Sequence, residues 1–199
     1  MEERRLYERA KSKYEEEGFC FSSRIFDEKS IARAIMHQDL VISGQYETGI
    51  APRRPFDKSQ ASTGAIVKID SSHRADYTIR NFVSNPVLGE WAAAITGAQW
   101  VQIWAVQLLV KPGMGSDDAK VGWHQDRNYW TAWEEGSELF TAWVALSEVG
   151  EDAGPMSFVR GSHHWGLLQG SDFFGQDLEA QKRDMALPEG SAWEEVGAT

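Results

Sequence analysis

The sequence contains a single cysteine, Cys20, and no apolar run that approaches the roughly 18 residues of a membrane-spanning helix. One cysteine excludes an intrachain disulfide and a zinc site built from several thiolates. Basic residues are also scarce, because 20 Lys and Arg stand against 30 Asp and Glu, for a formal net charge of −10. This balance argues against nucleic acid and against an anionic membrane surface as partners, since both require a basic face.

The amino-terminal segment MEERRLYERAKSKYEEE lacks the apolar core of a signal peptide. Together with the single cysteine, this favours a soluble protein of the reducing cytoplasm. Aromatic side chains are abundant, including 9 Trp, and the hydrophobic fraction is 42%. The 199 residues are expected to form one domain that buries about 70% of its unfolded surface.

Helical periodicity dominates the first half of the sequence. Apolar residues recur at helical spacing before Gly18, namely at Leu6, Tyr7, Ala10 and Tyr14. Asp27 and Asn85 are candidate N-caps of two further helices, and the polar segment 43–64 is expected to be a long loop. Residues 1–97 are therefore predicted to be a mainly helical entry region.

Strand-like patterns dominate the second half. Both faces of segment 100–110 are largely apolar, which predicts a strand that is covered on both sides. Shorter strands are expected at residues 19–21, 121–125, 139–147 and 156–159. Helices that come first and strands that come later indicate an α+β fold with a mostly antiparallel sheet, and residues 98–199 supply most of its strands.

The stretch WHQDRNYW, residues 123–130, carries the most informative chemistry. On an extended chain, residues i and i+2 face the same side, so His124 and Asp126 can bind one metal ion. With a second histidine they would form the two-histidine, one-carboxylate site of non-haem Fe(II) oxygenases, which leaves positions open for a co-substrate and oxygen. A single His-x-Asp pair is weak evidence alone, because the pattern also arises by chance.

The tripeptide HQD also occurs at residues 37–39, inside the helix that Asp27 is expected to open. Residues i and i+2 of a helix lie on different sides, so His37 and Asp39 cannot chelate one ion. Both are interpreted as solvated polar residues near the helix end, and His73 is interpreted as a surface histidine.

The surroundings of His124 resemble the phytanoyl-CoA dioxygenase family of Fe(II)/2-oxoglutarate oxygenases. A buried strand leads into KPG at 111–113, and WHQD is followed by a strand with Trp143 and by GPMSFVRGSHHWG at 154–166. The segment YEEEGFCF at 14–21 also resembles the entry segment of that family. The resemblance implies a double-stranded β-helix, a cupin-like jelly-roll of about eight strands, with the amino-terminal helices packed outside.

The resemblance also implies roles for individual residues. His124 and Asp126 match the first two iron ligands of the family. Lys111 and Trp143 match residues beside the 2-oxoglutarate co-substrate. Weaker candidates for the substrate pocket follow the metal pair directly, namely Tyr129 and Trp130.

By this resemblance, the chain is expected to be an Fe(II)- and 2-oxoglutarate-dependent dioxygenase. It would use O₂ to hydroxylate an aliphatic C–H bond of a small or lipid-like metabolite. Halogenation is disfavoured because Asp126 occupies the ligand position that related halogenases replace with a small residue. The alternatives are a catalytically silent jelly-roll that binds a ligand or metal, and a chance placement of His124 as a core residue.

The family pattern also includes a second histidine ligand and an arginine that pairs with the distal carboxylate of 2-oxoglutarate. Neither has a counterpart after His164 and Arg183. His163 and His164 are not favoured as the missing ligand, because the family uses the Gly-Ser-His segment to shape the site. Residues 1–199 are therefore expected to be a carboxy-terminally incomplete dioxygenase domain that lacks its late strands and is poorly soluble or inactive.

Overall fold

The computed structural model describes residues 2–56, 66–111 and 120–198. The chain divides into two compact units, Met1–Pro112 and Gly113–Thr199. Each unit contains one two-stranded antiparallel sheet among its described residues. The α+β class that the sequence predicts is confirmed.

The first unit is built mainly from helices. Its elements in chain order are α1 (Glu2–Glu17), α2 (Glu28–Ile42), β1 (Val67–Asp70), the short 3-10 helix η2 (Ser72–Arg74), α3 (Tyr77–Val83), α4 (Pro86–Thr96) and β2 (Gln107–Val110). None of the helices in the described ranges combines the length and the apolar character that a bilayer crossing requires.

The helix boundaries follow from local signals in the sequence. The carboxylate of Asp27 accepts the Ser30 amide at 2.7 Å, and the side chain of Asn85 accepts the Val87 amide at 3.0 Å. These bonds satisfy amides that the first turns of α2 and α4 leave unpaired. Gly97 ends α4 in the left-handed conformation, with φ +75°. The two predicted N-caps are confirmed.

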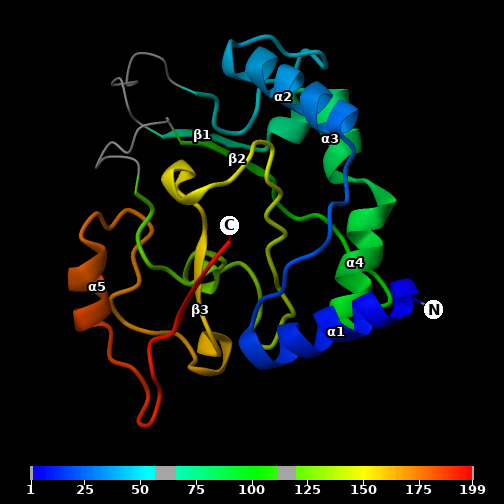
Figure 1. Ribbon diagram of the computed structural model, residues 1–199. Helices are drawn as coiled ribbons and strands as arrows, with labels where there is room; N and C mark the ends of the chain where they lie inside the picture. Colours follow the sequence, from blue (N-terminus) through cyan, green and yellow to red (C-terminus); the bar gives the residue numbers. More distant parts are fainter. Residues whose placement is uncertain (1, 57–65, 112–119, 199) are drawn as a thin grey trace. The chain divides into compact units, whose positions relative to one another are not determined.

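The helices of the first unit pack through aromatic pairs and a small aliphatic core. Helices α1 and α4 pack against each other (Figure 1). Tyr7 of α1 meets Trp91 of α4 edge-on, with ring centroids 4.9 Å apart. Phe26, just before α2, stacks on Phe82 of α3 at 4.1 Å. The buried cluster collects residues from α2, β1, α3 and β2, together with Ala75 between the elements, and comprises Val41, Ile69, Ala75, Ile79 and Leu108. This core fixes α2 beside the start of α3.

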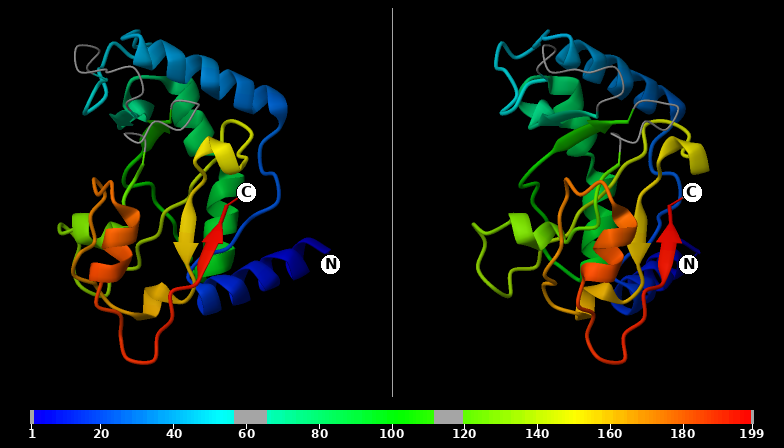
Figure 2. Two further views of the ribbon diagram at one scale, coloured as in Figure 1. Left: turned by 60° about the vertical axis from the view of Figure 1, so that its left-hand side comes forward. Right: turned by 90° about the vertical axis from the view of Figure 1, so that its left-hand side faces the viewer.

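The second unit has less regular structure. Its elements are the 3-10 helix η4 (Asp126–Tyr129), η5 (Glu151–Ala153), β3 (Ser157–Val159), η6 (Ser162–His164), α5 (Leu178–Asp184) and β4 (Glu195–Gly197). Figure 2 shows β3 and β4 as neighbouring arrows that run in opposite directions. In this pair of strands Phe158 lies opposite Val196. Lys182 of α5 forms an ion pair with Glu195 of β4 and lies over the Trp123 ring.

Several predicted strands are wrong as far as the structure describes them. Segment 100–110 forms a strand only in β2, and Trp100 is 91% exposed, so this segment is not covered on both sides. Residues 19–21, 121–125 and 139–147 form no strand, whereas residues 156–159 do in β3. A strand needs ladder hydrogen bonds to a neighbour, and β-prone composition alone does not provide a partner. The described residues therefore show four short strands and no closed barrel.

Candidate metal centre

The imidazole of His124 is oriented by its own backbone. Its Nδ1 atom lies 2.8 Å from the carbonyl oxygen of Gly122. A carbonyl can only accept, so Nδ1 carries a proton and donates it. The Nε2 atom then faces Asp126, 3.4 Å from Oδ1. Metal-binding histidines characteristically donate from their other ring nitrogen in this way, which fixes the tautomer and the ring orientation.

Asp126 is the first residue of η4, and its other carboxylate oxygen, Oδ2, also has a hydrogen-bond partner. The hydroxyl of Thr141 donates a hydrogen bond of 2.6 Å to Oδ2. A hydrogen bond from His124, which forms only when the imidazole carries a second proton on Nε2, and then the hydrogen bond from Thr141 lower the pKa of Asp126 from its ordinary value against the opposing effect of burial. The carboxyl group is therefore ionised near neutral pH, and its Oδ1 atom is directed at the imidazole.

The backbone beside His124 is paired with a segment far along the chain. The amide of Gly122 donates to the Phe173 carbonyl at 2.9 Å, and the amide of Asp172 donates to the Trp123 carbonyl at 3.0 Å. The side chain of Gln181 accepts the Trp123 amide at 2.9 Å. A Cβ atom at Gly122 would overlap the Asp172 carbonyl oxygen, so only glycine fits this close approach.

Gln125, between the two candidate ligands, acts as a second anchor. Its side chain donates to the Gly166 carbonyl and accepts the Leu168 amide, both at 2.7 Å. Its own amide donates to the Ser171 hydroxyl at 2.9 Å. Sequence reasoning missed this residue, because a polar side chain between two ligands gives no sign of its partners.

Aromatic rings surround the imidazole. The ring centroid of Phe173 lies 4.9 Å from that of His124, in an edge-on arrangement, and the ring of Tyr129 lies at 6.3 Å. The Tyr129 hydroxyl accepts the Phe173 amide at 2.8 Å. The structure thus places Tyr129 beside His124, and it adds Phe173, which the sequence did not single out.

For the other predicted site residues, the structure gives their position next to neighbouring elements. Trp130 caps the end of η4, and Trp143 follows Thr141 by two residues and is partly exposed. Lys111 directly follows β2 in the first unit, where burial lowers its pKa. Its role, like that of Trp143, stays a prediction.

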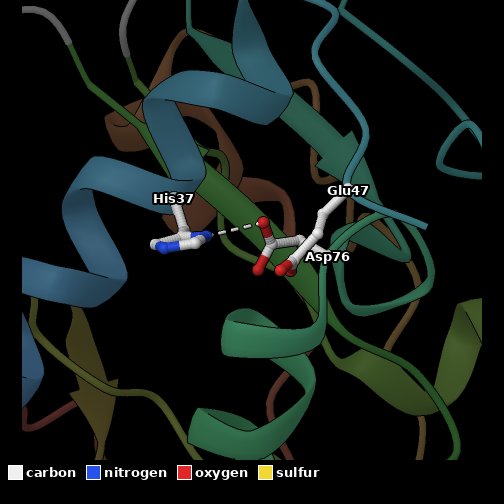
Figure 3. A group of neighbouring side chains, drawn as sticks. All are labelled: His37, Glu47 and Asp76. Carbon is white, nitrogen blue, oxygen red and sulfur yellow. Dashed lines mark hydrogen bonds and ion pairs between the residues drawn. The ribbon is translucent and has the colours of Figure 1, made fainter. Parts of the chain in front are cut away.

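Among the described residues, one group of three metal-ligating side chains has donor atoms within 4.8 Å of one another, and it lies in the first unit. It comprises His37, Glu47 and Asp76, which Figure 3 shows with their polar ends together. The Nδ1 atom of His37 lies 2.7 Å from Asp76 Oδ2, and the His37 side chain is only 14% exposed. The interpretation of His37 as solvated is therefore wrong, because its face of α2 meets the start of α3.

Two related predictions have different outcomes. Asp39 is exposed and lies outside the group of three, as helix geometry predicts. His73 is not a simple surface residue, because burial, followed by the charges of Arg80 and Arg74, lowers its pKa. Its Nδ1 atom is buried without a hydrogen-bond partner in the described structure.

The chain was compared with protein families, with curated proteins and with solved structures. The model of the family described as phytanoyl-CoA dioxygenase (PhyH) matches residues 14–188. The matched range contains both His124 and Asp126, and it extends through both units. No curated protein and no solved structure matches the chain.

Proposed function

The chain belongs to the phytanoyl-CoA dioxygenase family, and we propose that it is an Fe(II)- and 2-oxoglutarate-dependent dioxygenase. The proposed reaction is hydroxylation of an aliphatic C–H bond of a small or lipid-like metabolite by O₂. The observation that carries the proposal is the 3.4 Å approach of His124 Nε2 to Asp126 Oδ1.

The donor set of this pair fits ferrous iron. Imidazole nitrogen and carboxylate oxygen are the ligand types of the two-histidine, one-carboxylate oxygenase site, and His124 and Asp126 would be two of its three protein ligands. A bound Fe(II) ion would supply the oxygen chemistry, coupled to oxidative decarboxylation of 2-oxoglutarate to succinate and carbon dioxide. The side chains are 21% and 42% exposed, so one side of the pair remains open to solutes.

The chain itself orients these donors. The Gly122 carbonyl accepts the Nδ1 proton of His124 and so keeps Nε2 available, and the Thr141 hydroxyl orients the Asp126 carboxylate. Phe173 contacts the imidazole and would reduce the access of water to it.

The remaining site assignments form part of the proposal. Tyr129 and Trp130 follow the metal pair and would line the substrate pocket. Lys111 and Trp143 would contact 2-oxoglutarate, as their match to the family pattern implies. Partial burial of the Lys111 ammonium is compatible with a carboxylate partner.

The test is a two-step assay on the full chain. Fe(II) and 2-oxoglutarate are added without oxygen, the weak visible charge-transfer band is recorded, and succinate is measured after oxygen is admitted. The proposal predicts both signals, and it predicts that Asp126→Ala removes them. Asp152→Ala, which removes an exposed carboxylate of η5, is the matched control and should leave both unchanged.

Two outcomes would contradict the proposal. A band without succinate would support the catalytically silent jelly-roll instead. Equal signals from Asp126→Ala and the unsubstituted chain would show that Asp126 takes part in neither iron binding nor turnover.

A further inference from the structure

A second cluster of metal-ligating side chains lies in the first unit. His37 comes from α2, Glu47 from the loop that follows it, and Asp76 from the N-cap of α3. One donor atom from each residue lies within 4.8 Å of the other two. Figure 3 shows the imidazole and the two carboxylates converging from three segments of the chain.

The carboxylates are held in place by the backbone of α3. Asp76 accepts the Ile79 amide through Oδ1 at 2.9 Å, and Glu47 accepts the Tyr77 amide through Oε2 at 3.0 Å. The amide of Thr48 donates to the Ala75 carbonyl at 3.1 Å, which ties the loop to the start of the helix. Each of these amide bonds uses one carboxylate oxygen and leaves the other, Oδ2 of Asp76 and Oε1 of Glu47, outside the bond, so both side chains are partly ordered for a ligand role.

The negative charges of the two carboxylates in the cluster favour the binding of a cation. Asp76 is only 1% exposed, and a second carboxylate, that of Glu47, lies within 4.8 Å of it. Two neighbouring carboxylates repel each other, and a buried charge is stable only where it is paired or binds a metal ion. A divalent ion would balance both carboxylates.

The cluster is also reachable from solvent. The three residues line an open hollow together with Leu40, Gln45 and Tyr46. An ion can therefore enter, and water molecules can complete its coordination. This distinguishes the cluster from a closed structural ion pair, in which no space remains for a ligand.

We propose that His37, Glu47 and Asp76 bind a divalent first-row transition-metal ion, distinct from the ion at His124 and Asp126. One imidazole and two carboxylates, with water in the remaining positions, suit Zn²⁺ or Mn²⁺, whereas Mg²⁺ prefers an all-oxygen environment. On binding, the metal takes the place of the proton on His37 Nδ1. A neutral imidazole then carries that proton on Nε2, whereas an imidazolium keeps its Nε2 proton and releases the Nδ1 proton to solvent. The ion would brace α2 against α3.

The probe is Zn²⁺, added to the full chain carrying His124→Ala and Asp126→Ala so that the other donor pair cannot contribute. Affinity is measured by competition with a chromophoric chelator, and stability is measured by thermal unfolding. We expect one Zn²⁺ per chain and a higher unfolding temperature, because an ion that binds only the folded state stabilises it. Mg²⁺ at the same concentration should leave the unfolding temperature unchanged.

The decisive variant is Glu47→Gln, made in the same background. The amide oxygen can still accept the Tyr77 amide, so the fold is preserved while the charged ligand is lost. We expect the Zn²⁺ affinity to fall by roughly tenfold or more. Asp39→Asn removes the same charge from an exposed position of α2, two residues from His37, and should leave the affinity unchanged.

A second readout follows the imidazole directly. Zn²⁺ should shift the ¹⁵N resonance of His37 Nδ1, and circular dichroism should show that Glu47→Gln remains folded. Equal Zn²⁺ affinities for Glu47→Gln and Asp39→Asn would overturn the proposal. An unchanged Nδ1 resonance at saturating Zn²⁺ would do the same, since it would leave His37 as a purely structural partner of Asp76.

Discussion

The Nε2 atom of His124 lies 3.4 Å from Oδ1 of Asp126, with a hydrogen bond behind each group that fixes its orientation. When His124 is neutral, both facing atoms are acceptors, because its proton is used at the Gly122 carbonyl. Two acceptors at this distance are stabilised by a cation between them, either a proton or a metal ion. This geometry supports the proposed role of the pair as two metal ligands, and its properties are testable one at a time.

The hydroxyl of Thr141 is expected to position the Asp126 carboxylate. Thr141→Val removes the 2.6 Å hydrogen bond to Oδ2 while it keeps the size of the side chain. We expect the Fe(II) affinity to fall by roughly 10- to 100-fold, as is typical when a partner of a metal ligand is lost. Thr141→Ser should restore most of the affinity, and a Val variant that binds iron as tightly as the unsubstituted chain would exclude this role.

The pKa of Asp126 in the iron-free chain should lie below its ordinary value of 3.8. The folded-state pKa is depressed, so the ionised carboxylate contributes stability above pH 3.8 that is lost as the pH falls through the folded-state pKa. A ¹³C titration of the side-chain carboxyl measures this midpoint directly. Thr141→Val should move the midpoint upward, and a midpoint at or above 3.8 in the unsubstituted chain would refute the prediction.

Gly122 should tolerate no side chain. Gly122→Ala places a Cβ atom against the Asp172 carbonyl oxygen and beside the Gln181 side chain. We expect a loss of about 1–3 kcal/mol in the free energy of unfolding, because the paired segments must separate. Gly150→Ala, where nothing lies within 4 Å of the new atom, should change stability by less than about 0.5 kcal/mol in the same urea titration. Similar effects at the two positions would argue against the close approach at Gly122.

The N-cap of α4 offers a test of the first unit alone. Asn85→Ala leaves the Val87 amide without its side-chain acceptor and should cost about 1 kcal/mol of stability. Asn85→Asp keeps an acceptor oxygen and should be close to neutral. Chemical denaturation compares the three chains, and an unchanged unfolding midpoint for Asn85→Ala would show that the cap is dispensable.

The helices of the first unit could be predicted from the sequence, because their signals are local. Asp27 and Asn85 need only the next three residues to act as caps, and Gly97 needs only its own backbone freedom. The strands could not be predicted equally well, since ladder pairing depends on a distant partner. Segment 100–110 has the composition of a strand, yet only β2 at its end pairs, with β1.

The candidate site likewise combines features that local sequence indicates with features that depend on distant residues. The spacing of His124 and Asp126 indicates a shared ligand position, and the structure adds the distance between them. Thr141 and Phe173 reach the pair through tertiary contacts that no short motif encodes. His37 shows the same limit: helix geometry separates it from Asp39, but its partner Asp76 lies 39 residues away, and no local pattern indicates that contact.

The most direct test of the account is the equilibrium affinity for Fe(II) without oxygen. It should be measured on chains that carry Glu47→Gln, so that the second proposed site contributes little. We expect His124→Ala to weaken iron binding by roughly 100-fold or more, beyond the loss that is typical for a partner of a metal ligand. The exposed His164, changed to Ala, should have no effect. Equal iron affinities for His124→Ala and His164→Ala would contradict the assignment of His124 as an iron ligand.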